Sequence, residues 1–427
     1  MLFKNHNKIV VNILWHFIPS VFRISFSFFG TMYVAREMSK DNYGQFQYLT
    51  SLFYICLIYE QITNASIVKE RLILNEKESL NILYSVILSN LIFAVFASFV
   101  LYGMMRGAGE LSYIFIFSMA LICRAFSPLV YFFDSKLMSK QSSLTQLFGN
   151  LFYNIGRIFN PSSLLYQSSL FFSQYLVTTI SNIYIFLKLK SKLVSNRLSF
   201  KVDEMRIIFI RSIPLFISLL LMQLVQRIDV FLIEYFRGFT EVADYSIVIK
   251  LSEPWLFLSS AIVVSVFPKL INSELSDNNK LLDHFHFINT VMLVISSTIV
   301  VGTFLFGDEI ITLLFKEKYI RSIPLLKVYI ISLPFLFLNM VQQIWEQKMN
   351  RLYFSVFRLF VSLLVNIVLN IYLIPRMGTL GAVYATIVSY SMLGIILNVT
   401  TKDSRAFLRT QIQPRRLSFY LGYIKRL

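Results

Sequence analysis

Hydrophobic stretches long enough to cross a membrane recur along the whole chain, separated by short polar segments. A bilayer core of ~30 Å requires about 20 apolar residues in a helix. Twelve stretches approach this length, so we predict an all-α polytopic membrane protein with about twelve transmembrane helices in two six-helix bundles. The predicted spans are residues 9–35, 44–68, 80–104, 111–133, 144–160, 164–187, 207–236, 244–268, 285–306, 323–345, 354–374 and 381–401.

The longest polar connection runs from Lys188 to Arg206 and divides the spans into two sets of six. The predicted organisation is an N-terminal six-helix bundle at 1–187, a basic cytoplasmic linker at 188–206, a C-terminal six-helix bundle at 207–401 and a basic cytoplasmic tail at 402–427. The tail could lie along the membrane surface as an amphipathic segment or be disordered.

The two sets of spans share a weak internal sequence similarity. Arg23-Ile24 precedes Asn42-Tyr43 by about the same distance as Arg227-Ile228 precedes Asp244-Tyr245. Because six is an even number of spans, the two halves would share one orientation and form a parallel repeat. This pattern is typical of secondary transporters.

Basic residues set the orientation. The segments that are cytoplasmic with an N-terminus inside hold 24 Lys or Arg, and the opposite loops hold 9. Cytoplasmic loops carry the excess of positive charge in membrane proteins, so both termini are predicted to be cytoplasmic. The same rule accounts for the net charge of +17, and no nucleic-acid partner is predicted.

Composition agrees with a membrane protein. The chain has 427 residues, of which 56% are hydrophobic and only 15% charged, whereas soluble domains are about 45–50% apolar and ~25% charged. Two soluble domains are therefore excluded, and lipid must solvate most of the chain.

Several predicted spans carry a basic residue in their interior. A charge at the bilayer centre costs at least ~2.5 kcal/mol, so it is kept where it faces a partner or a water-filled cavity. Together these residues predict a positively charged cavity and an anionic substrate. Arginine suits phosphate because its planar guanidinium binds two oxygens at once. The residues are Arg23, Arg124, Arg227 and Lys250.

Acidic residues in the spans leave a second interpretation open for each cation. Interhelical ion pairs, such as Arg227 with Glu60 or Lys250 with Glu253, would also explain a buried charge. For the whole set we favour the cavity, since four cations exceed what local pairing explains. The acids that could neutralise the cations, or take part in proton or ion coupling, are Glu60, Asp229 and Glu253.

Amide side chains share helix faces in several spans. One span carries Gln146, Asn150 and Asn154 on one face, and another carries Asn366 and Asn370. Such groups could hydrogen-bond a sugar, but Asn and Gln also hold transmembrane helices together.

The sequence shows no signature of catalysis, of a cofactor or of a metal site. Of the four histidines, only His16 enters a predicted span, and His284 and His286 lie at a helix start. No CxxC pair, phosphate-binding loop, HExxH or nucleophile-elbow pattern is present, so a transporter is favoured over an enzyme or an ATP-driven pump.

Four stretches resemble one known family, the Wzx-type polysaccharide flippases. The first runs from Arg23 through Val34-Ala-Arg-Glu-Met38 to Asn42-Tyr-Gly44, and the others lie in the second half. These three are Arg227-Ile-Asp-Val-Phe-Leu-Ile through Ala243-Asp-Tyr-Ser to Val266-Phe-Pro-Lys269, Ile310-Ile-Thr-Leu-Leu-Phe with Tyr319 and Pro324-Leu-Leu, and Leu373-Ile-Pro-Arg-Met-Gly378 with Gly381-Ala-Val-Tyr-Ala-Thr386.

The resemblance covers essentially the whole chain. It implies an O-antigen or capsule repeat-unit flippase of the multidrug/oligosaccharidyl-lipid/polysaccharide (MOP) exporter superfamily, with a MATE-like fold in the bacterial cytoplasmic (inner) membrane. It implies an undecaprenyl-pyrophosphate-linked oligosaccharide as the substrate, moved by alternating access through a cationic cavity. Membrane lipid, and polymerase and chain-length proteins of a polysaccharide pathway, are the further partners implied.

Two alternatives remain beside this interpretation. One is a small-molecule or drug exporter of the same superfamily, although cationic drugs would require an excess of acids in the cavity. The other is a membrane enzyme, either an O-antigen polymerase or a polyprenyl-sugar transferase. Such enzymes usually need a sizeable extracytoplasmic loop, whereas the largest here, about 307–322, is short and has no histidine.

Overall fold

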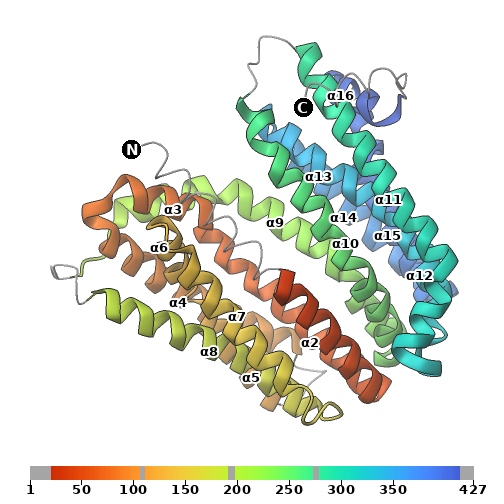
Figure 1. Cartoon of the computed structure of the whole chain (residues 1–427), viewed down its shortest axis with the longest axis horizontal. Helices are drawn as coiled ribbons and strands as arrows, with labels where there is room; N and C mark the ends of the chain where they lie inside the picture. Colours follow the sequence, from red (N-terminus) through yellow and green to blue (C-terminus); the bar gives the residue numbers. More distant parts are fainter. Residues whose placement is uncertain (1–20, 106–110, 191–197, 273–277, 414–427) are drawn as a thin grey trace. The chain divides into compact units, whose positions relative to one another are not determined.

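The structure is a computed structural model of the chain and describes residues 21–105, 111–190, 198–272 and 278–413. All regular secondary structure in these ranges is helical (Figure 1), as predicted. The chain divides into two compact units, Met1–Gln223 and Leu224–Leu427. We call them unit 1 and unit 2. The division falls inside one long helix, α9 (Val202–Arg237), and the bundle boundaries drawn from the sequence stay predictions.

Unit 1 begins, in the part described, with a helix over residues 21–37. Residues 9–20 of the predicted first span and residues 191–197 of the predicted linker lie outside the described ranges. The remaining helices of the unit before α9 are α2 (Lys40–Cys56), η1 (Leu57–Thr63), α3 (Ala65–Leu74), η2 (Glu76–Glu78), α4 (Ser79–Met105), α5 (Leu111–Arg124), α6 (Pro128–Ser135), α7 (Ser139–Gly156) and α8 (Leu164–Lys190).

Unit 2 follows α9 with long helices and short 3-10 turns. Its elements are α10 (Phe239–Asn272), α11 (Asn278–Phe315), η3 (Lys316–Tyr319), α12 (Ser322–Tyr329), η4 (Ile330–Ser332), α13 (Leu333–Lys348), α14 (Leu352–Met377), α15 (Thr379–Gly394), η5 (Ile396–Val399) and α16 (Lys402–Ile412).

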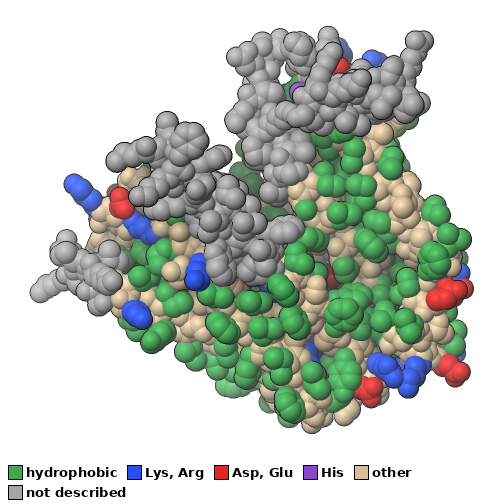
Figure 2. Space-filling view, in the orientation of Figure 1, with side chains coloured by type: hydrophobic (Ala, Val, Ile, Leu, Met, Phe, Trp, Pro, Cys, Tyr) green, Lys and Arg blue, Asp and Glu red, His purple; other side chains and the backbone are tan. Residues whose placement is uncertain are grey.

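Nine helical segments of the described residues are long and apolar enough to cross a membrane. They coincide with nine of the twelve predicted spans. The other three differ for local reasons: the first lies partly outside the described residues, the second is interrupted at Asn64, and the fifth, α7, is short and polar. Figure 2 shows hydrophobic side chains spread over the visible sides of the helices, as expected for surfaces that face lipid.

Two breaks in helices of unit 1 position the candidate site. After α2 the chain tightens into η1, and Asn64 then caps α3 by accepting a hydrogen bond from the Ser66 backbone N–H at 3.0 Å. The second break follows Arg124, where α5 ends and α6 starts with Pro128 at its first turn. Broken helices within a membrane are tolerated where protein groups satisfy the freed backbone.

Aromatic packing fixes the helices around these breaks. The Phe171 ring lies 5.0 Å from that of Phe53, 5.3 Å from that of Phe117 and 5.2 Å from that of Tyr175, measured between centroids. On α7, a Cβ at Gly149 would lie 2.8 Å from the Gln174 carbonyl oxygen of α8. Glycine therefore lets α7 and α8 approach closely, which brings their polar side chains to the same place.

An ion pair at the predicted cytoplasmic end of unit 1 ties α3 to α9. The Arg71 guanidinium donates to both carboxylate oxygens of Glu204, at 2.8 and 2.7 Å. These hydrogen bonds raise the pKa of Arg71 above its ordinary value, and the two-pronged geometry is the stronger kind of arginine pair.

In unit 2, α14 and α15 form a hairpin that turns at Gly378. This residue has φ of +61°, a left-handed backbone conformation that glycine adopts at little cost. The Glu241 carboxylate closes the turn by accepting from the Thr379 backbone N–H at 3.1 Å and from the Thr379 hydroxyl at 2.6 Å.

The start of the predicted tail is a docked helix. A capping box of Thr401 and Ser404 begins α16, and Phe407 is fully buried between Phe285 and Trp345, with centroid separations of 5.5 and 5.1 Å. Residues Lys402–Ile412 are therefore not a free tail, whereas residues 414–427 lie outside the described ranges.

Candidate functional site

The four predicted cations fall into two groups, one in each unit. Arg23 and Arg124 belong to unit 1, and Arg227 and Lys250 to unit 2. We call them, with their nearest acid, the unit 1 cluster (Arg23, Arg124, Glu60) and the unit 2 cluster (Arg227, Lys250, Glu253). Each cluster combines two basic residues with one acid, so each has a formal net charge of +1.

In the unit 1 cluster, Arg124 and Glu60 form a close ion pair. Arg124 Nη2 lies 2.6 Å from Glu60 Oε2, and the side chains are 32% and 5% exposed. Glu60 lies on η1 and Arg124 ends α5, so both partners sit at the helix breaks described above. The sequence suggested Arg227 as a partner of Glu60, whereas the structure pairs Glu60 with Arg124.

Side chains also satisfy the backbone at the end of α5. The Tyr59 hydroxyl donates to the Leu121 carbonyl oxygen at 2.7 Å, and the Thr179 hydroxyl donates to that of Cys123 at 2.9 Å. The carbonyls freed by the break are thus partnered from η1 and α8. This holds the Arg124 side chain in a fixed direction.

A cavity of about 150 Å³ adjoins Arg124. Its lining includes Gln146, Tyr175, Thr178 and Asn182 from α7 and α8. Arg23 reaches this lining, because its Nη1 donates to Gln146 Oε1 at 2.7 Å. The structure thus brings Arg23, Arg124 and Glu60 around one polar cavity, the unit 1 cavity.

In the unit 2 cluster, one acid serves two cations. Glu253 Oε1 lies 3.5 Å from Arg227 Nη2, and Glu253 Oε2 lies 3.1 Å from Lys250 Nζ. The pairing of Lys250 with Glu253 follows from their i, i+3 spacing on α10, as predicted. Glu253 also lines a cavity of about 160 Å³, together with residues such as Gln226, Ser252, Tyr329 and Tyr390.

Asp229 belongs to neither cluster. It is 1% exposed and accepts hydrogen bonds from Tyr245 Oη at 2.5 Å, Thr386 Oγ1 at 2.6 Å and Asn370 Nδ2 at 2.6 Å. Asn370 Nδ2 also donates to Asn366 Oδ1 at 3.0 Å. Thus α9, α10, α14 and α15 enclose one carboxylate with hydroxyl and amide groups.

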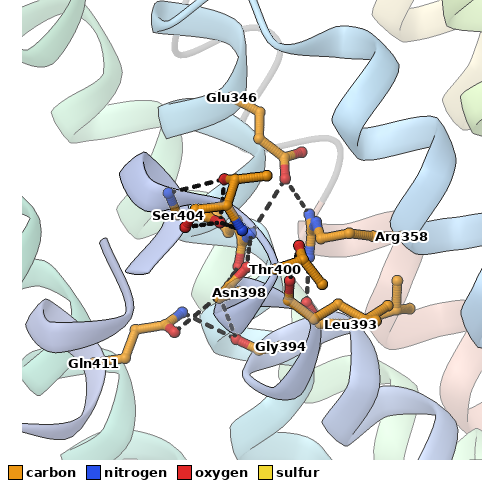
Figure 3. A network of polar contacts seen from close by, with 11 residues as sticks. Glu346, Arg358, Leu393, Gly394, Asn398, Thr400, Ser404 and Gln411 are labelled. Atoms are coloured by element: carbon orange, nitrogen blue, oxygen red, sulfur yellow. Dashed lines mark hydrogen bonds and ion pairs between the residues drawn. The ribbon is translucent and has the colours of Figure 1, made fainter. Parts of the chain in front are cut away.

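A buried ion pair that was not predicted from the sequence joins α13 to α14. Arg358 Nη2 lies 2.5 Å from Glu346 Oε1, and both side chains are 1% exposed. Figure 3 shows how Asn398 and Gln411 extend this network toward α16. Gln342 joins it by donating to Glu346 at 3.2 Å. Arg358 lies inside the predicted span 354–374 and Glu346 directly follows the predicted span 323–345, but neither is among the predicted site residues.

A second cation that the candidate set omitted is Arg157. It is 1% exposed, and its guanidinium binds Gln167 Oε1 at 3.2 Å and Thr31 Oγ1 at 3.1 Å and lies 4.6 Å from the Tyr153 ring centroid. Its position at the C-terminal end of α7 is electrostatically favourable, because the helix dipole presents partial negative charge there. The contacts indicate a structural role at the α7–α8 turn.

Within the described part of the chain, no group of three or more His, Cys, Asp or Glu side chains is placed to hold a metal ion.

Comparison with protein families gives two matches. The family described as "Polysaccharide biosynthesis protein" matches residues 9–274, a range that contains all seven candidate residues. A second family, MatE, matches residues 214–372. Among curated proteins, an uncharacterized membrane protein of Methanocaldococcus jannaschii is 26% identical over 175 residues. That match covers 39% of this chain and 34% of the relative, about a third of its length.

Solved structures with the same fold cover nearly the whole chain. The lipid II flippase MurJ in an inward closed conformation has a TM-score of 0.68 at 16% identity, covering 97% of this chain and 93% of its own. An inward-facing multidrug resistance MATE family transporter of the MOP superfamily has a TM-score of 0.64 at 12% identity, with coverage of 97% and 98%. A MOP superfamily transporter from Pyrococcus furiosus gives 0.61 at 13% identity, with coverage of 97% and 95%. At these identities the likeness shows the fold, which is that of MOP superfamily transporters.

Proposed function

The chain belongs to the polysaccharide biosynthesis protein family, and on this premise we propose that it is a lipid-linked oligosaccharide flippase. It translocates undecaprenyl-pyrophosphate-linked repeat units across the bacterial cytoplasmic membrane by alternating access, for O-antigen, capsule or exopolysaccharide synthesis. Polymerase and chain-length proteins of the same pathway are its proposed partners.

The observation that carries this proposal is the excess of positive charge in the two clusters. Each cluster lies among membrane-spanning helices, adjoins a cavity and keeps two cations for one acid. A pyrophosphate diester carries an ionised oxygen on each phosphorus, and a cluster with a net positive charge attracts such a group. Guanidinium and ammonium groups beside a cavity would bind these oxygens by charge-assisted hydrogen bonds.

The parts of the substrate would divide between protein and lipid. The polyprenyl chain is apolar and stays in the bilayer, whereas the sugar and pyrophosphate need polar surroundings. The cationic side chains Arg23, Arg124, Arg227 and Lys250 offset the hydration that the phosphates lose. A change between inward- and outward-open states then needs a difference in binding energy between those states.

Asp229 is the residue we propose for ion coupling. Its carboxylate is buried, and the hydroxyl and amide groups around it include the Asn366 and Asn370 side chains. Oxygen atoms of this kind suit a hard monovalent cation, and the carboxylate could instead take a proton. Glu60 and Glu253 pair with cations, so their proposed role is neutralisation.

The proposal is tested by reconstitution. Purified protein in vesicles should move undecaprenyl-pyrophosphate-linked oligosaccharide between leaflets, as followed by lectin access, and the lipid recovered should have an unchanged mass. Glycosyl transfer or bond cleavage that persists after further purification would replace the flippase by the membrane-enzyme alternative.

Coupling is tested in the same vesicles with Asp229→Asn, which keeps the size of the side chain and removes its charge. Wild-type flipping should respond to a sodium or proton gradient, and the variant should flip at a rate independent of that gradient. A variant that responds as the wild type does would assign coupling elsewhere.

Orientation is tested with reporter fusions. The distribution of basic residues predicts that fusions after residues 195 and 410 report the cytoplasm and that one after 312 reports the outside. A cytoplasmic signal at 312 would contradict the twelve-span topology.

The MatE match to residues 214–372 favours a second candidate, a small-molecule exporter. A cationic drug would meet two clusters of the same sign as itself, which costs binding energy. Vesicles that export a cationic dye but leave lipid-linked sugar in place would establish this candidate over the flippase.

A further inference from the structure

The unit 1 cavity has a chemical character that its arginine alone does not indicate. It is enclosed by side chains of unit 1 from α5, α6, α7 and α8. Its volume of about 150 Å³ is some tenfold larger than the ~10–15 Å³ needed for one water. Its place beside two broken helices is typical of substrate sites in transporters.

The Glu60 carboxylate neutralises the positive charge of Arg124 beside the cavity. Glu60 lies 2.6 Å from the guanidinium and is almost fully buried. A phosphate that approached Arg124 would also approach this carboxylate, and the repulsion between the two anions would offset the attraction to the cation. The pair therefore leaves Arg124 itself with little net charge for a phosphate and suits a neutral ligand that is rich in hydrogen-bonding groups.

Three buried atoms of the cavity lining lack a hydrogen-bond partner among the described residues. They are a donor, Arg124 Nε, an acceptor, Asn182 Oδ1, and the Ser127 hydroxyl oxygen, which can do both. Asn182 is 3% exposed and lines the cavity. Leaving a buried polar group without a partner costs free energy, so each of these atoms indicates a missing ligand group or water. An ionised phosphate accepts hydrogen bonds but cannot donate one to Asn182, whereas a sugar hydroxyl does both.

The remaining walls fit a sugar ring. Gln146 and Thr178 add further polar groups, while Tyr175 and Tyr131 add ring faces against which the C–H face of a pyranose can pack. The Arg124 guanidinium lies 5.7 Å from the Tyr175 centroid, which keeps both groups at the same wall.

From these contacts we infer that the unit 1 cavity is a subsite for one sugar residue of the lipid-linked substrate. Arg124 and Glu60 act there as a neutral pair that binds sugar hydroxyls, and Asn182 Oδ1 accepts a hydrogen bond from a sugar hydroxyl. The pyrophosphate is left to cations other than Arg124. This inference rests on the flippase proposal and changes the role of Arg124 within it.

The test compares lipids with and without a sugar. Full-length protein in nanodiscs is titrated with undecaprenyl pyrophosphate and with the same lipid carrying glucose, galactose, N-acetylglucosamine or N-acetylgalactosamine. The readout is the ratio of the Kd for the bare lipid to the lowest Kd for a sugar-bearing one. Several hydrogen bonds of about 1 kcal/mol each make a wild-type ratio of roughly tenfold or more expected.

Two variants probe the subsite. Asn182→Leu removes the acceptor, and Arg124→Lys keeps the charge but loses Nε and the guanidinium fork. Each should reduce the ratio by about 3- to 10-fold, the value of one hydrogen bond. The matched control is Asn90→Leu, a buried asparagine of α4 that accepts from the Thr63 hydroxyl at 2.7 Å and does not line this cavity. It should leave the ratio unchanged.

The outcomes separate the two proposals. A wild-type ratio near one for all four sugars, or an unchanged ratio in whichever of the two variants folds, would overturn the sugar subsite while leaving the flippase in place. Wild-type protein that binds neither the bare nor the sugar-bearing lipids would overturn the flippase proposal itself.

Discussion

Unit 2 contains two sets of intramembrane charges that differ in their surroundings. Arg358 and Glu346 form a one-to-one pair in which both side chains are 1% exposed. Arg227 and Lys250 share Glu253, and the three side chains are 15%, 25% and 37% exposed. The first set is buried and pairs one cation with one acid, whereas the second is more exposed and places two cations beside one acid.

The difference explains what each set can do. Arg358 also donates to the Leu393 carbonyl, and Gln342 donates to Glu346, so protein groups meet the charges of the pair. The two opposite charges of this pair therefore balance each other. In the unit 2 cluster the acid lines a cavity of about 160 Å³ and cannot neutralise both cations. A charge inside a span is thus a sign of function when it is partly exposed and a cavity adjoins its cluster.

The largest effect is expected from breaking the buried pair. Replacing either Arg358 or Glu346 by leucine leaves the other charge buried and unpaired, which should lower the free energy of unfolding by about 3–5 kcal/mol. The double leucine variant should recover most of this loss, because apolar groups of similar volume often replace a buried pair without cost. Thermal unfolding and membrane protein levels measure both; equal loss in single and double variants would contradict the pairing argument.

An intermediate effect, on export rather than stability, is expected from the unit 2 cluster. Arg227→Gln should reduce export at least ~10-fold at equal protein level, because a preorganised charge contribution of about 1.4 kcal/mol or more is lost. Unfolding should change little, since removing a charge lowers the cost of burial in the membrane. Arg227→Lys should retain part of the activity.

The matched control for that series is Arg237→Gln on the same helix. Arg237 donates to the carbonyls of Ile374 and Pro375 and lies outside the cluster, so export per protein should stay near wild type. Glutamine variants of Arg23, Arg124 and Lys250 extend the series. Full export by all four cation variants would refute a charge-dependent site even with the fold intact.

The smallest effect is expected where charges meet solvent. Arg351 pairs with Asp403 of α16, and the side chains are 31% and 63% exposed. Exposed pairs contribute about 0–1 kcal/mol, so Asp403→Asn should shift the unfolding free energy by no more than that. The shift should shrink as salt is raised. A loss of unfolding free energy as large as that of Arg358→Leu would mean that solvent exposure does not determine how much an ion pair contributes to stability.

Local features of the site followed from the sequence where the partners are close in the chain. Lys250 and Glu253 are three residues apart on one helix, and their pairing was predicted. Glu60 and Arg124 are 64 residues apart, and only the packing of η1 against the end of α5 brings them together. Hydropathy averaged over a span did not locate either break, because the polar segments at 60–64 and 124–128 are short and apolar residues flank them.

Hydrophobicity alone determined the membrane class, the approximate positions of nine spans and the presence of cations within them, because transfer into lipid depends on each segment's own composition. Tertiary structure alone decided which charges are buried in a pair and which are partly exposed beside a cavity. Glu346 lies at a predicted span end and becomes buried in a network that reaches Gln411 of α16 through Gln342 and Asn398. Burial and pairing depend on atoms contributed by distant segments, and no local pattern records which segment will cover a given side chain.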